Sequence, residues 1–167
     1  LRMSLMKKLL FLFCLLSWSV LHAQKTINRP PFIAKATETI EIAAIHLSDT
    51  ATVVDVDAKF IPKNWIRIAP ATCLVADNGE RYQVRQGVGI ELGQEFWMPE
   101  SGEATFSLIF PPLPASVKSF DFVEGEGERD FNLFGISLIG KLPKLQLPKD
   151  LGKAGKATAV ALPTPEI

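Results

Sequence analysis

Apolar and polar residues alternate along the middle of the chain in short blocks. Residues 51–60 alternate without a break, and their apolar side is Val54, Val56, Ala58 and Phe60. A period of two predicts a β-strand with one buried face. Residues 37–47 are rich in Thr and Ile, and a Ser48-Asp49-Thr50 turn follows them. We therefore expect a hairpin of these two segments, with a β-bulge between Ala44 and Ile45 where the apolar phase shifts.

The second half of the chain repeats this alternation. Strands are predicted at residues 103–110, 119–124 and 131–138, and the proline cluster at 111–114 predicts a loop that leaves the first of them at a sheet end. The Asn-Gly pair of Asp77-Asn78-Gly79-Glu80 predicts a type I′ hairpin turn.

After residue 23 no stretch keeps a helical period over three turns. The fold class we predict is all-β. We expect an immunoglobulin-like antiparallel β-sandwich of about seven to nine strands over residues 32–140.

The beginning of the chain has the composition of an export signal. Residues 1–23 contain two lysines, then an apolar run, then Leu21-His22-Ala23, which predicts a signal peptide cleaved after Ala23. The run is shorter than the roughly 20 residues that span a bilayer. Bulky Phe13 before a mid-run Cys14 argues against a lipid anchor. We expect an exported protein, periplasmic or associated with the outer membrane, whose contact with a membrane is only through this signal.

Two further segments flank the predicted sandwich. Residues 24–31 are polar and end in Pro-Pro, so we expect an extended lead-in. Residues 141–167 are rich in Pro, Lys and Ala, which is typical of a linker or a disordered tail and favours a further domain downstream. Without residues 1–23 the chain has 15 basic and 18 acidic residues. This balance gives no reason to expect a nucleic-acid partner.

An acidic turn is the most site-like stretch of the sequence. Glu124, Glu126, Glu128 and Asp130 alternate with small or charged residues and are weak candidates for Ca²⁺ ligands. The spacing of an EF-hand is missing, and an acidic hairpin turn that is simply solvated explains the same residues. We expect no cofactor.

Catalytic chemistry has little support in the sequence. His46 has no second His or Cys near it, and neither a Gly-x-Ser-x-Gly nor a Cys-x-x-Cys motif is present. Cys73 lies in an apolar run, which favours a small buried residue, although a single exposed thiol is the alternative. We do not expect an enzyme.

Trp65, Phe96, Trp97 and Met98 are candidates for an exposed aromatic surface. Tryptophan is enriched where proteins contact ligands, so these residues are a possible binding surface for a protein or a glycan. The alternative is that they cover the core of the sandwich.

Three phrases of the sequence carry a resemblance to a known family. They are residues 60–68 (FIPKNWIRI), residues 89–103 (GIELGQEFWMPESGE) and residues 106–124 (FSLIFPPLP to SFDFVE). They resemble the N-terminal β-sandwich module of exported TlpA-type thioredoxin-like proteins, the thiol–disulfide oxidoreductases of Gram-negative bacteria. The resemblance covers about residues 32–140. It implies an accessory or interaction module whose catalytic thioredoxin-like domain is not in this chain, so no catalytic residue is carried over.

Two other hypotheses compete with an accessory module. The chain is alternatively a free-standing periplasmic or surface protein that binds a peptide or glycan on the aromatic group. The third hypothesis is redox participation through Cys73.

Overall fold

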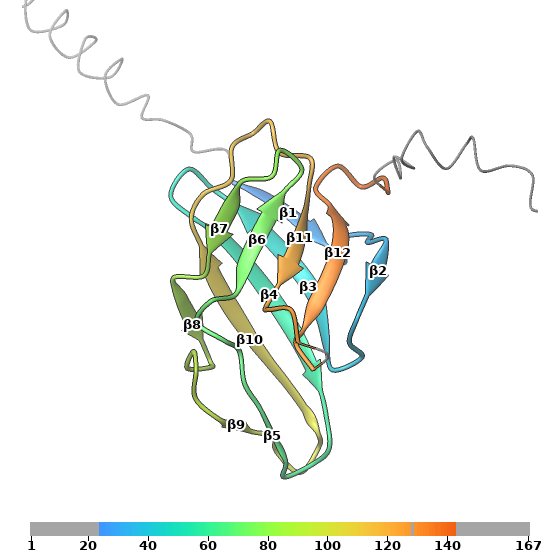
Figure 1. Cartoon of the computed structure of the whole chain (residues 1–167), viewed down its shortest axis with the longest axis vertical. Helices are drawn as coiled ribbons and strands as arrows, with labels where there is room; N and C mark the ends of the chain where they lie inside the picture. Colours follow the sequence, from blue (N-terminus) through green and yellow to red (C-terminus); the bar gives the residue numbers. More distant parts are fainter. Residues whose placement is uncertain (1–23, 128, 143–167) are drawn as a thin grey trace, which may run out of the picture.

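The computed structural model describes residues 24–127 and 129–142, which form twelve β-strands and no helix (Figure 1). Three strands are two residues long, and the nine longer ones agree with the predicted number. The predicted antiparallel β-sandwich is confirmed. The predicted signal peptide (residues 1–23), Glu128 and residues 143–167 of the predicted tail lie outside the described residues. Among residues 24–127 and 129–142, no helix is long and apolar enough to cross a membrane.

The first sheet contains the strands predicted from the clearest alternation. Its order is β1 (Lys25–Asn28), β3 (Ile40–Leu47), β4 (Thr52–Lys59), β10 (Glu103–Phe110) and β8 (Gln86–Val88). The β3–β4 hairpin is confirmed, and β4 pairs with β10 along its whole length. The bulge falls between Ile42 and Ala44, slightly earlier than predicted, and the Ala43 carbonyl accepts a hydrogen bond from the Arg29 amide.

The expected lead-in belongs to this sheet. Lys25–Asn28 pairs with β3 as the edge strand β1, so the sandwich begins before residue 32. Three of its four residues are exposed. An edge strand contributes one row of hydrogen bonds and few buried side chains, which explains why its polar composition is tolerated.

The second sheet faces the first. Its order is β2 (Ala34–Lys35), β12 (Asn132–Ser137), β11 (Ser119–Val123), β6 (Cys73–Ala76) and β7 (Arg81–Gln83). The β6–β7 hairpin is confirmed, but its turn is not type I′, because Gly79 has a positive φ of 86° and Asn78 does not. The Gly79 amide donates to the Ala76 carbonyl, and the Ala76 amide donates to the Glu80 carbonyl. This is a three-residue loop with a glycine bulge.

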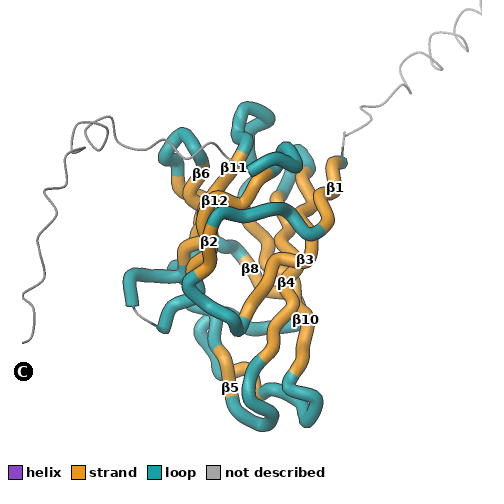
Figure 2. Tube along the Cα trace, turned by 90° about the vertical axis from the view of Figure 1, so that its right-hand side faces the viewer, coloured by secondary structure: helices purple, strands orange, loops and turns teal. Residues whose placement is uncertain are grey.

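A two-stranded ribbon completes the fold at one end of the molecule. It consists of β5 (Trp65–Ile66) and β9 (Phe96–Trp97), near the ends of β4 and β10 (Figure 1). The two large layers are separated clearly in the turned view of Figure 2. Phe110 of β10 meets Phe122 of β11 edge-on at 6.3 Å between ring centroids, which places the main core between the sheets.

Candidate functional site

The ribbon of β5 and β9 divides its side chains between the core and the surface. Ile66 pairs with Phe96, and Trp65 pairs with Trp97. Residues directly opposite in an antiparallel pair lie on the same face. Ile66 is 3% exposed, and Phe96 is partly buried and 6.4 Å from the Phe106 ring. The opposite face of the ribbon therefore carries both tryptophans.

Trp65 is 40% exposed and Trp97 is 60% exposed, so the two indoles form an aromatic surface; we call them the Trp65–Trp97 pair. Met98 is 3% exposed and belongs to the core. The expectation of a binding surface is thus wrong for Met98, whereas Phe96 packs against the core. The alternative interpretation, in which the aromatic group covers the core, accounts for Phe96 and Met98 but not for the two exposed tryptophans.

A hollow of about 610 Å³ adjoins the Trp65–Trp97 pair, because Trp65 is one of its walls. Phe60 and Phe131 are further aromatic walls of the hollow. Arg67, Arg129, Glu124 and Asp130 supply charged groups, and threonines 37 and 39 supply hydroxyls. The lining comes from the segment before β3, from β5 and its flanks, and from the acidic turn between β11 and β12. Aromatic walls with a few polar groups are typical of ligand sites.

Glu124 fixes the position of the acidic turn. One carboxylate oxygen accepts a hydrogen bond from the Ala69 amide (2.8 Å), and the other accepts from the Phe131 amide (2.7 Å). Burial raises the pKa of Glu124, outweighing the opposing effects of these two amides and of the Arg67 charge. The carboxylate therefore braces the acidic turn against the segment that follows β5.

The three acidic candidates that the structure describes, Glu124, Glu126 and Asp130, do not form a metal site. Glu124 is engaged with two backbone amides, and Asp130 accepts a hydrogen bond from the Gly127 amide at 2.7 Å. Glu126 is exposed, and Glu128 is outside the described residues. In the described part of the chain no group of three His, Cys, Asp or Glu residues is placed to hold a metal ion. The turn is held by its own hydrogen bonds.

His46 lies in a row of polar side chains on the outer face of the first sheet. Its Nε2 is 2.8 Å from an Asp55 oxygen, and its Nδ1 is 3.0 Å from the Thr26 hydroxyl. The Ser107 hydroxyl donates to the other Asp55 oxygen at 2.6 Å. Ser107 is thus bonded to the carboxylate and not to the imidazole, so these residues do not form a nucleophile–base pair.

Cys73 is buried within β6, with an exposed fraction of 5%. Its strand is central in the second sheet, between β11 and β7. The prediction of a small buried residue is confirmed, and the hypothesis of an exposed redox thiol is wrong because Cys73 is buried.

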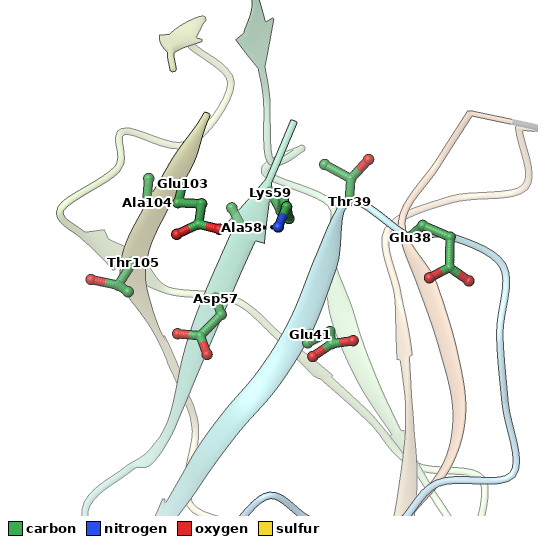
Figure 3. A pocket seen from close by; sticks show the side chains of 9 residues that line it. All are labelled: Glu38, Thr39, Glu41, Asp57, Ala58, Lys59, Glu103, Ala104 and Thr105. Carbon is green, nitrogen blue, oxygen red and sulfur yellow. Dashed lines mark ion pairs between the residues drawn. The ribbon is translucent and has the colours of Figure 1, made fainter. Parts of the chain in front are cut away.

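A second hollow, of about 660 Å³, lies on the outer face of the first sheet (Figure 3). Its four carboxylates come from Glu38, Glu41, Asp57 and Glu103. Each has a cationic partner: Lys35 for the first two, Arg29 for Asp57 and Lys59 for Glu103. Exposed ion pairs of this kind contribute little and mark a solvated strand face.

Arg67 is not among the site residues predicted from the sequence, although the alternation of its strand indicates that it is exposed. Residues 65–68 alternate Trp-Ile-Arg-Ile, and Ile66 and Ile68 are both buried whereas Arg67 is exposed. Arg67 therefore lies on the side of Trp65. Phe131 and Arg129 join the site only through the path of the acidic turn, which the sequence does not reveal.

Comparison with family models, with curated proteins and with solved structures found no match to this chain.

Proposed function

We propose that this chain is a non-catalytic binding module of an exported protein and that its ligand stacks on the Trp65–Trp97 pair. The proposal is carried by one observation: two cross-strand tryptophans are exposed side by side on a ribbon whose other face is packed into the core. Large aromatic side chains left in water beside a lined hollow are typical of contact surfaces.

The exposed areas set the scale of the expected affinity. Fractions of 40% and 60% together equal about the full surface of one tryptophan side chain, on the order of 200 Å². Covering that area contributes at most about 5 kcal/mol at about 25 cal/mol per Å². Association costs several kcal/mol, so the pair alone supports weak binding and needs polar contacts from the hollow to reach micromolar affinity.

Trp97→Ala tests the proposal without disturbing the core, because Trp97 is the more exposed indole. After residue 23 the chain has only two tryptophans, both in the site, so intrinsic fluorescence of a protein starting at Gln24 reports ligand contact directly. We expect Trp97→Ala to weaken binding about tenfold or more and to leave the melting temperature nearly unchanged. Phe134→Ala, an exposed aromatic on β12, is the matched control. Loss of folding in Trp97→Ala, or binding equal to that of the control, would refute the proposal.

The accessory role beside a thioredoxin-like domain stays a prediction. The burial of Cys73 is compatible with it, because any disulfide exchange would then require thiols from another domain or protein. The reading frame beyond Ile167 tests this role. Continuation into a Cys-x-x-Cys thioredoxin pattern would support it, and a stop codon would favour a free-standing binding protein.

A further inference from the structure

The hollow beside Trp65 contains three carboxylates, and the protein itself uses all of them. Glu124 accepts hydrogen bonds from the Ala69 and Phe131 amides, and Asp130 accepts one from Gly127. Glu38 forms an ion pair with Lys35 at 2.7 Å. Their charge is thus balanced or hydrogen-bonded before a ligand arrives.

The two arginines of the hollow differ from these carboxylates. Arg67 and Arg129 both line it, and neither guanidinium has a hydrogen bond or an ion pair with another described residue. By comparison, Arg29 on the first sheet is 2.6 Å from Asp57 and 3.8 Å from Glu41. The charge of Arg67 acts on Glu124 and opposes the rise of its pKa, but neither arginine uses its N–H donors on a described residue, so both can bind a ligand in a hollow whose acids are occupied.

From this arrangement we propose that the ligand is an acidic saccharide, with a sugar ring against Trp65 and its carboxylate bound by Arg67 and Arg129. The proposal rests on the binding function proposed above and names the ligand class. A guanidinium group matches a carboxylate with two parallel hydrogen bonds. In a uronate unit the carboxylate is attached to the ring itself, so one sugar presents an apolar ring face and an anionic group together.

The other walls favour a saccharide over an acidic peptide. Phe60 and Phe131 continue the aromatic lining, and the hydroxyls of Thr37 and Thr39 are suited to sugar hydroxyl groups. An aspartate or glutamate side chain brings a carboxylate on a flexible stem without a rigid apolar face, so it would use the arginines and leave the aromatic walls in water. An acidic peptide is therefore an alternative outcome of the experiment.

The test is a fluorescence titration of the chain from Gln24 to Ile167 with oligogalacturonate and with its methyl ester, which has the same ring but no charge. Oligomannuronate extends the test to a second ring stereochemistry. We expect at least one free acid to bind about tenfold more tightly than its ester and to weaken several-fold between about 50 and 500 mM NaCl. Arg67→Gln and Arg129→Gln should each lower affinity for the acid about five- to tenfold and leave ester binding unchanged. Arg85→Gln, an exposed arginine outside the hollow, is the control and should change neither.

The possible outcomes distinguish a failure of the acidic-saccharide inference from a failure of the proposed binding function on which it rests. Equal binding of acid and ester, with loss of both in Trp97→Ala, overturns the acidic ligand and keeps the binding module. Failure of both uronates to bind at millimolar concentration overturns the inference, as does arginine-dependent binding of a poly-glutamate peptide in their place. Uronate binding that is insensitive to both tryptophans and both arginines overturns this site as well.

Discussion

The Glu124 carboxylate joins two segments that are far apart in the sequence, so its removal should cost more stability than its place in a surface turn suggests. In Glu124→Ala the Ala69 and Phe131 amides both lose their acceptor. Hydrogen bonds to a charged group contribute about 1.5–3 kcal/mol each. Water can replace part of the loss because Glu124 is only partly buried, and the mutant no longer bears the cost of burying a carboxylate.

We therefore expect Glu124→Ala to lower the free energy of unfolding by about 2 kcal/mol, equivalent to about 8 °C in melting temperature for a domain of this size. Glu126→Ala is the matched control, since Glu126 lies in the same turn and is exposed. It should stay within about 0.5 kcal/mol of the parent protein. Urea denaturation followed by tryptophan fluorescence measures both variants. A difference between them of less than about 0.5 kcal/mol would show that the brace does not stabilise the fold.

The pH dependence gives a second measurement of the same group. The pKa of Glu124 is raised in the folded state, so the folded protein retains this proton at pH values where the unfolded chain has lost it. The part of the stability that depends on this pKa shift is then fully present below the unfolded pKa and is lost as pH rises through the folded pKa. The difference in stability between the parent and Glu124→Gln should become smaller from pH 4 to pH 7. A difference that grows instead would mean that the amide hydrogen bonds outweigh burial.

Three further predictions concern the sandwich itself. Cys73 should react with a thiol reagent only after denaturation, and reaction at the rate of a free thiol in the native protein would contradict its burial. Gly135→Ala should destabilise the fold by about 1–3 kcal/mol, because its φ of 64° is left-handed and a Cβ would meet the Ile33 side chain. A neutral effect in thermal denaturation would be inconsistent with that geometry. Burial opposes ionisation of Asp55, but hydrogen bonds from Ser107 and His46 prevail and hold its pKa below the usual value. The stability that this pKa shift contributes is therefore present above the unfolded pKa and is lost as pH falls through the folded pKa. The parent should lose stability relative to Asp55→Asn across that acidic range, and parallel pH profiles of the two proteins would oppose this.

The long strands were predictable because their signal is local. In β4 and β10 buried apolar residues recur at every second position, and a period of two survives whatever the strand pairs with. These residues are Val54, Val56, Ala58, Phe106, Leu108 and Phe110. Edge strand β1 was not recognised as part of the sheet because its pairing with β3 is non-local and its side chains are mostly exposed. The role of Glu124 was not predictable either, since Ala69 lies 55 residues away from it.

The aromatic site was only partly predictable from the sequence. Alternation within residues 65–68 puts Trp65 and Arg67 on one side of a strand, and alternation within 96–98 separates Trp97 from its two neighbours. Both facts can be derived from the sequence. They leave open which side of each strand faces the core. The predicted binding surface of Trp65, Phe96, Trp97 and Met98 therefore combined residues that face the core with residues that face solvent. The answer comes from the pairing of Ile66 with Phe96. Ile66 is buried in the core, and Phe96 packs against the core beside the Phe106 ring, so the same register brings the two tryptophans together in solvent. The site is thus a consequence of the register between two short strands, and shifting that register by one residue would remove it.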